Sequence, residues 1–341
     1  MKLWSKKLGA EVLKETWLMK FAGDSTDDLI QIRDDTQKSA GDSIRYGLRM
    51  QLTSNGIQGD GTLEGNEESL VTYSDTVLIN QIRNAVRSAG RMSQQRVPFS
   101  VRDEALSGLR DWLANLLDQS GFNQICGYTP QTNTSVTGNN ATISVDSSHQ
   151  KLTNNTVDQS IATTATFVLS IIDYAVEACK VLSPAIRPVR SGDANGYYVA
   201  FLHPYQVTDM RISTTTGQWL DIQKAVATGG EIDDNPIFSG ALGVYNGTIL
   251  HSDYRVTQGV NGTTPTTAVT AVRRAVLCGA QAMMMGFGRD NGPNRFTWVE
   301  ELFDYENELG VSGGLIYGMK KTVFNSADFA DVVMSSYAIA H

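Results

Sequence analysis

The most informative stretch for the fold is residues 43–83, SIRYGLRMQLTSNGIQGDGTLEGNEESLVTYSDTVLINQIR. Apolar and polar side chains alternate through residues 43–53, and β-branched and aromatic side chains recur through residues 70–83. A period of two indicates β-strands, because successive side chains of a strand point to opposite faces. The stretch therefore predicts two strands that form one long hairpin.

A long connector, SNGIQGDGTLEGNEES, joins the two strands and is rich in glycine, asparagine and acid. Hairpin connections usually have about two to five residues, and much longer ones are often functional. The carboxylates could bind a hard cation, but the alternating ligand pattern of an EF-hand loop is missing. The glycine and lysine spacing of a phosphate-binding loop is missing too. We therefore interpret residues 56–68, the acidic tip, as a solvated loop.

Residues 98–119, PFSVRDEALSGLRDWLANLLDQ, give the clearest helix signal in the chain. Ser100 is the expected N-cap, and Asp103 follows three residues later, as in a variant of the capping box. Apolar side chains then recur at helical spacing. Gly121 is the expected end of this helix, because glycine is favoured just past a helix C-terminus.

Residues 1–40 form a separate N-terminal segment. Apolar side chains, among them Trp4 and Trp17, recur there at roughly helical spacing, and the acidic run after Gly23 should end the helix. The segment is either the first helix of a core or an arm that docks on another element or subunit. Its lysines favour the solvated face of a helix over contacts with DNA or another acidic partner. They are Lys2, Lys6, Lys7, Lys14 and Lys20.

The second half of the chain mixes strands and helices without a regular βαβ rhythm, which favours the α+β class. Residues 127–160 are rich in Thr, Asn and Ser, so they predict an exposed excursion, placed on the outside of any assembly. The remaining expected elements are a helix over 161–182, a strand over 197–203, a short helix over 218–228, a hairpin at Asn246-Gly247, an apolar run over 271–285, and closing strands over 296–306, 314–324 and 330–337.

Composition and charge exclude several classes of protein. The 341 residues carry 28 Lys and Arg against 36 Asp and Glu, a net charge of −8, which argues against tight, sequence-specific nucleic-acid binding. With 41% hydrophobic residues the chain should fold rather than stay disordered. Only 19% of residues are charged, which suggests that part of the surface is covered by other copies. We find no signal peptide and no apolar stretch long enough to span a membrane.

Candidate chemistry is sparse. Three scattered cysteines form no CxxC pair, and none of the four histidines has another histidine or a cysteine nearby at metal-binding spacing. No nucleophile–base motif is present. We therefore expect no catalytic, cofactor-binding or metal-ligating residues, and no cofactor.

Several pieces of sequence, in order, carry a family resemblance. Within residues 41–105 they are LRMQLT, GDGTLEGNEE, YSD and AVRSAGRMSQQR. Residues 188–211, PVRSGDANGYYVAFLHPYQVTDMR, and residues 304–329, DYENELGVSGGLIYGMKKTVFNSADF, continue the pattern. With these pieces the chain resembles the major capsid protein family of N-four-like tailed bacteriophages over most of its length, and least over 127–160.

The resemblance implies the Johnson fold of tailed-phage and herpesvirus capsids. Its parts would be an N-terminal arm (1–40), an extended loop formed by a long β-hairpin (41–95), the first part of a peripheral domain with a spine helix and a polar insertion (96–160), an axial domain (161–294), and closing strands of the peripheral domain (295–341).

The implied function is that of a major capsid protein, present in the virion and assembled in the host bacterial cytoplasm. Pentamers and hexamers would form an icosahedral shell that encloses double-stranded DNA without sequence-specific binding and without a membrane. A scaffolding protein, a portal and a decoration protein are the further expected partners. Each extended loop would lie over a neighbouring subunit. The expected intersubunit contacts are Ile44, Tyr46, Leu48, Met50, Asp60, Glu64, Glu67, Glu68, Trp4 and Trp17.

Two other functions stay open. A tail or receptor-binding component would suit the polar run at 127–160, although no fibre-like repeat is visible. A cytosolic enzyme would need a site that the sequence does not display.

Overall fold

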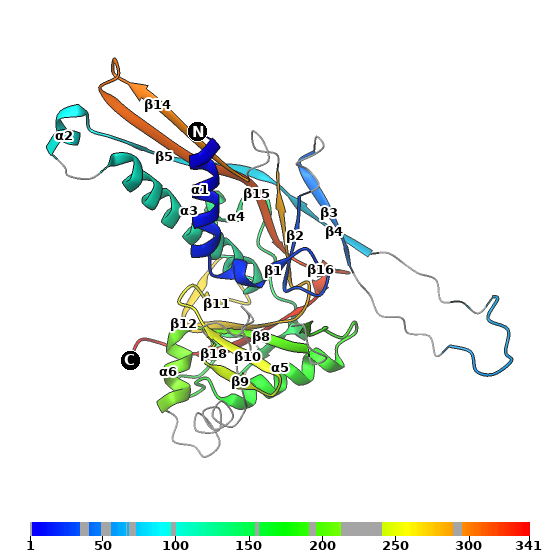
Figure 1. Cartoon of the computed structure of the whole chain (residues 1–341). Coiled ribbons are helices and arrows are strands. Elements are labelled where there is room, and N and C mark those ends of the chain that lie inside the picture. Colours follow the sequence, from blue (N-terminus) through cyan, green and yellow to red (C-terminus); the bar gives the residue numbers. More distant parts are fainter. Residues whose placement is uncertain are drawn as a thin grey trace.

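The computed structural model describes residues 2–34, 41–48, 56–65, 67, 73–96, 100–153, 157–190, 196–212, 241–288 and 295–341 (Figure 1). Two sheets organise these residues. Sheet I has six strands, ordered β1 (Ala22–Gly23), β2 (Ile30–Arg33), β13 (Met283–Phe287), β15 (Glu308–Lys321) and β14 (Phe296–Phe303), with β5 (Asn80–Arg87) paired to β15. Sheet II has eight, ordered β6 (Gln150–Leu152), β18 (Asp331–Tyr337), β12 (Ala268–Cys278), β8 (Gly196–Leu202), β10 (Thr248–Ser252) and β9 (Gly243–Tyr245), with β11 (Gln258–Val260) on β12 and β7 (Val189–Arg190) on β8.

The 14-residue strand β15 is the centre of sheet I. One edge pairs antiparallel with β5, and the other pairs with β14 and then with β13. Strand β2 adds to β13 in parallel, so a strand from the N-terminal segment completes a sheet built mainly from the C-terminal part of the chain.

Helix α3 (Val101–Ile125) packs on β15 and carries helix α1 (Lys2–Glu15) beside it (Figure 1). The N-cap prediction is confirmed: the Ser100 hydroxyl accepts a hydrogen bond from the Asp103 amide at 3.4 Å. The predicted end at Gly121 is wrong. Gly121 is buried inside the helix, where a Cβ would meet the Leu18 side chain at 2.4 Å, and the helix ends only before Gly127, whose φ is +61°.

Within this chain the N-terminal segment is part of the core. Leu8 and Val12 of α1 are fully buried, and Trp4 stacks on Trp298 of β14 with ring centroids 5.7 Å apart. After α1 a short 3-10 helix, η1 (Leu18–Phe21), leads into β1. The interpretation as a first core helix therefore describes how the segment packs on its own subunit.

Residues 127–153 and 157–160 of the polar run are folded, which corrects the predicted excursion. The run contains α4 (Thr134–Thr137), η3 (Ser147–His149), β6 and η4 (Asp158–Ser160), and β6 pairs in parallel with β18. Buried polar side chains, together with apolar ones such as Val136, hold it in place. The buried Asp158 forms an ion pair with Arg274 of β12, with Oδ2 and Nε 2.7 Å apart.

Sheet II contains the predicted hairpin at Asn246-Gly247, where φ is 45° and 70°, as a two-residue turn of this kind requires. The predicted strand over 197–203 corresponds to β8. The helix predicted over 161–182 starts later, as α5 (Leu169–Val181), after a stretch rich in β-branched threonine. A helix that we did not predict, α6 (Pro204–Ile212), begins at a proline, which is favoured in a first helical turn. The short helix predicted over 218–228 lies outside the described residues.

Each sheet contains strands from both sides of the predicted boundary at 294–295. The apolar run over 271–285 divides into β12 of sheet II and β13 of sheet I. The predicted closing strands correspond to β14, β15 and β18, but β18 belongs to sheet II. Between β15 and β18 the chain forms a small hairpin, β16 (Val323–Phe324) and β17 (Ala327–Asp328).

A buried ionic cluster lies at this crossing from sheet I to sheet II. The Lys321 ammonium, fully buried, is 2.6 Å from Asp328 and 3.9 Å from Asp331. Burial raises the pKa of Asp331 well above its usual value, and the nearby Asp328 raises it further. Among the described residues, no helix has both the length and the apolar character that a membrane crossing requires.

Candidate functional site at the extended loop

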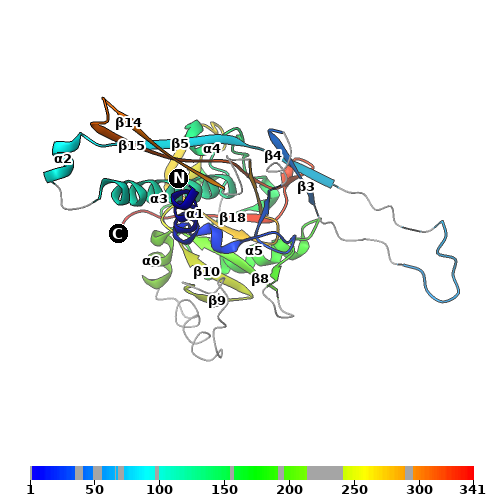
Figure 2. The same cartoon turned by 45° about the horizontal axis from the view of Figure 1, so that its top comes forward.

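The extended loop begins as a two-stranded hairpin. Strands β3 (Ser43–Leu48) and β4 (Tyr73–Leu78) pair antiparallel over their full lengths. After a single residue, Ile79, β4 is followed by β5 of sheet I. Residues 56–65 of the acidic tip are all exposed and lie beyond the hairpin, away from both sheets (Figures 1 and 2). The loop thus combines a base fixed to sheet I with an uncovered tip.

The apolar side of the hairpin is buried against its own subunit. Ile44, Tyr46 and Val77 pack with Met284 of β13 and are at most 2% exposed. The Tyr46 hydroxyl donates a hydrogen bond to the Met285 carbonyl. These contacts form the loop root, defined here as β3, β4 and the residues that hold them.

This burial corrects part of the sequence prediction. Ile44 and Tyr46 have almost no exposed surface left to cover, and Leu48 is only 7% exposed, so this face is not available to a neighbour. The alternation correctly indicated an apolar face, but it could not indicate that β13 of the same chain lies against it. Met50, on the same predicted face, lies outside the described residues.

Polar contacts fix β4 from two sides. Asp75 accepts from the Lys320 ammonium at 2.6 Å and from the Val323 amide at 3.1 Å. On the other side the buried Asn140 side chain accepts from the Leu78 amide at 3.0 Å and donates to the Leu78 carbonyl at 2.7 Å. Asn140 therefore replaces a missing neighbouring strand at this position.

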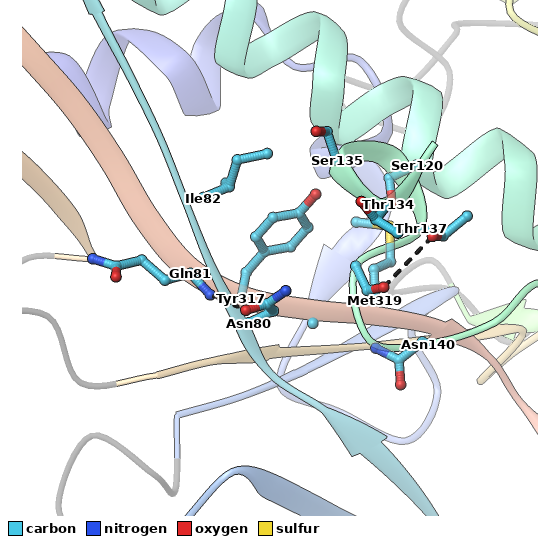
Figure 3. A pocket seen from close by; sticks show the side chains of 12 residues that line it. Asn80, Gln81, Ile82, Ser120, Thr134, Ser135, Thr137, Asn140, Tyr317 and Met319 are labelled. Carbon is cyan, nitrogen blue, oxygen red and sulfur yellow. Dashed lines mark hydrogen bonds between the residues drawn. The ribbon is translucent and has the colours of Figure 1, made fainter. Parts of the chain in front are cut away.

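A small cavity of about 200 Å³ lies next to this contact, between β5, β15, α3 and α4 (Figure 3). Its lining is uncharged and includes Asn80, Ser120, Thr134, Asn140 and Tyr317. Burial raises the pKa of Tyr317 to about 12, so its hydroxyl stays protonated at neutral pH. This chemistry suits ordered polar packing and offers no nucleophile–base pair.

The close fit of the root depends on glycine at one position of β15. A Cβ added to Gly318 would lie 2.1 Å from the Leu78 carbonyl oxygen, which is backbone and cannot rotate away. We expect Gly318→Ala to reduce the free energy of unfolding by about 1–3 kcal/mol, because β4 and β15 must move apart to make room for the methyl group. Chemical denaturation measures this change.

Gly47 in β3 is the matched control, because a Cβ there would meet nothing within 4 Å. We expect Gly47→Ala to leave stability unchanged or to raise it slightly. Equal losses from both substitutions would show that the packing of β4 on β15 is not what requires glycine.

The other predicted contact residues divide into two groups. Asp60, Glu64 and Glu67 of the acidic tip are exposed, whereas Glu68 lies outside the described residues. Trp4 and Trp17 pack within their own subunit, Trp17 among aromatic rings that include Phe122 and Phe201. For all of these residues, contact with a neighbouring copy stays a prediction.

Residues at the N-terminal segment and at the far end of sheet I were not among those predicted from the sequence. Asp118, buried in α3, accepts from the Trp17 and Leu18 amides at 3.0 Å each. An aspartate inside an otherwise apolar helix stripe was the available signal. At the β14–β15 turn Tyr305 is fully exposed and, like Asp304 and Glu306, has a positive φ, for which the sequence offered no signal.

Comparisons with known proteins agree with this architecture. A family model described as phage capsid protein matches residues 1–340. The major capsid protein of Pseudomonas phage KPP25 is 26% identical, over 95% of this chain and 89% of that protein. The capsid of Ralstonia phage GP4 has a TM-score of 0.81 and 31% identity, covering 94% of this chain and 90% of that one.

A second solved structure, the cyanophage Pam1 capsid asymmetric unit, is similar in fold, with a TM-score of 0.71 at 19% identity and coverage of 96% of this chain and 94% of that one. The predicted Johnson-type, α+β architecture is therefore confirmed.

Proposed function

The chain belongs to the phage capsid protein family, and from that premise we propose that its copies form the pentamers and hexamers of an icosahedral phage head. The family establishes a structural component of a virion shell. The proposal adds the two kinds of ring, assembly in the host bacterial cytoplasm, and the absence of any catalytic activity.

The observation that carries the proposal is the contrast between the loop root and the acidic tip. The root is buried and fixed by ion pairs and hydrogen bonds, whereas residues 56–65 touch neither sheet. The hairpin strands at the root are already covered by β13 of the same chain, so of the described loop residues only the exposed residues 56–65 are left without a supporting surface. A surface on a neighbouring copy would supply that support.

Such a contact joins two different surfaces, the tip of one copy and the body of the next. Contacts of this kind generate closed rings when the rotation between copies closes on itself. The exposed carboxylates Asp60, Glu64 and Glu67 favour a basic receiving surface. One loop in each subunit is then enough to link every copy in a ring to its neighbour.

The charge of the chain suits a container for DNA. Contacts between phosphates and Lys or Arg dominate nucleic-acid affinity, and this chain carries a net charge of −8. We infer that the shell encloses double-stranded DNA without binding it tightly or sequence-specifically. A scaffolding protein, a portal and a decoration protein complete the set of proposed partners.

Electron microscopy of the purified full-length chain, alone and with its scaffold, tests the proposal. We expect rings of five or six subunits, or closed shells, because the loop links each copy to the next. Discrete monomers at every concentration, especially with measurable turnover of a small molecule, would instead favour the enzyme alternative. Fibrous trimers would favour a tail component.

A further inference from the structure

Three arginines lie where α3 meets sheet II, and among the described residues only two of them have a carboxylate partner. Arg274 pairs with Asp158 at 2.7 Å, and Arg255 contacts Asp118 at 3.3 Å and Asp253 at 3.2 Å. No carboxylate in the described part of the chain lies within ion-pair distance of Arg273. Its guanidinium carbon instead lies over the ring of Tyr205, 5.6 Å from the centroid.

A half-buried guanidinium without a counter-ion is costly, because burial removes water and leaves the charge uncompensated. Burial accordingly lowers the pKa of Arg273, and only the nearby hydroxyl groups of Tyr205 and Tyr128 oppose that shift. Guanidinium nonetheless stays protonated in proteins. Arg273 therefore presents a positive charge that the described residues do not neutralise.

The charge borders a crevice of about 440 Å³ between α3 and sheet II. Arg273 Nε is itself buried and has no hydrogen-bond partner among the described residues. Buried polar atoms are nearly always paired, so this donor is a position where a ligand in the crevice could accept a hydrogen bond.

The other groups at the crevice define the charge of that ligand. His203 lies on the wall, and burial followed by the charge of Arg273 lowers its pKa to about 4, so it is neutral at pH 7. Arg255 is already paired. The remaining wall residues are amides, hydroxyls and one valine: Asn115, Gln119, Asn123, Tyr128, Gln131, Tyr254, Val256, Thr257 and Gln258.

We propose that this crevice binds an oxyanion, whose oxygens accept hydrogen bonds from the planar guanidinium of Arg273. Carboxylate and phosphate share the geometry that the guanidinium fork recognises. The anion comes either from free phosphate or from a carboxylate of a second copy, such as one on the acidic tip. The second source rests on the proposed function, whereas the first does not.

Thermal unfolding of the full-length chain tests the site. Chloride buffer is compared with inorganic phosphate and with glutamate at equal ionic strength. We expect a saturable rise in Tm of about 2–4 °C for the wild type, because a ligand that binds only the folded state stabilises it. Arg273→Gln should remove the rise. Arg273→Lys keeps the charge but loses the planar fork, so it should reduce the rise, and it serves as the test if the glutamine variant does not fold.

Arg83→Gln is the matched control, because Arg83 is exposed on β5, outside the crevice, and should keep the full rise. It also accounts for the general stabilising effect of phosphate salts. A rise in Tm that survives unchanged in Arg273→Gln would place the anion elsewhere and overturn the proposal.

The two sources differ in assembly. If a second copy supplies the carboxylate, Arg273→Glu blocks shell formation, and Glu64→Arg or Glu67→Arg in the same chain restores it. If free phosphate is the ligand, Arg273→Glu abolishes the phosphate response, and neither tip substitution restores it. The proposal is wrong if neither anion shifts the wild-type Tm and Arg273→Glu still forms normal shells.

Discussion

A chain that lacks residues 56–68 should fold normally and remain soluble, yet form no closed shells. The described residues of this segment are exposed and contact neither sheet, so we expect the free energy of unfolding to change by less than about 1 kcal/mol. The loop root, with Tyr46 buried and Asp75 paired, stays intact. The deletion removes only the part of the loop that reaches a neighbouring copy.

Denaturation curves and electron micrographs of the same preparation measure the two effects. A second variant, with Asp60→Asn, Glu64→Gln and Glu67→Gln, keeps the length of the tip and removes most of its charge. Failure of both variants to assemble would identify charge as the requirement, whereas failure of the deletion alone would identify reach and shape. Normal particles from the deletion would contradict the proposed role of the loop.

Lys321→Met should be among the most destabilising single substitutions in this chain. The Lys321 ammonium is fully buried with two aspartates, 2.6 Å from Asp328 and 3.9 Å from Asp331. Removing one partner of a buried ion pair leaves an uncompensated charge and costs about 3–5 kcal/mol. The cluster lies at the crossing between the sheets, so we expect the subunit to lose cooperative unfolding as well as stability, measured by calorimetry.

Asp331→Asn in the same cluster should have the opposite effect. Burial raises the pKa of Asp331, so the folded chain holds a proton that the unfolded chain releases near the ordinary value of about 4. The contribution of Asp331 to stability is therefore complete below that pH and is lost as the pH rises towards its folded pKa. The asparagine variant has no such loss.

Unfolding measured from pH 4 to pH 8 checks the sign of this effect. The asparagine variant should match the wild type near pH 4 and exceed it in stability at pH 7 to 8. If Asp331→Asn destabilised the chain at pH 8 as strongly as Lys321→Met, Asp331 would be an ionised partner of the lysine, and the proposed protonation would be wrong.

Local patterns in the sequence predicted the elements correctly where short-range physics decides them. The Ser100 cap and the Asn246-Gly247 turn are examples, because each depends on neighbours within a few residues. The prediction at Gly121 was wrong because the role of this glycine depends on a contact distant in sequence: it leaves room for Leu18, about a hundred positions earlier in the chain. The residue type alone does not distinguish a glycine that ends a helix from one that permits close packing.

The loop root shows the same limit at the candidate site. Period two revealed an apolar face around Tyr46, but which surface covers that face depends on β13, more than two hundred residues later. Asn140 lay in a run that composition marked as exposed, since amides usually face water. Its two bonds to Leu78 become apparent only when the fold brings the two segments together.

Because β4 leads directly into β5, the extended loop is attached to sheet I at one end and projects from it. One nearly unbroken strand path runs from the hairpin into sheet I, where eight residues of β5 pair with β15. Because only Ile79 separates β4 from β5, we expect a force on the hairpin to be passed to sheet I. In a shell that changes curvature, the loop and sheet I should tilt together as one rigid body. The conformational change that accompanies the tilt should then occur in other parts of the subunit.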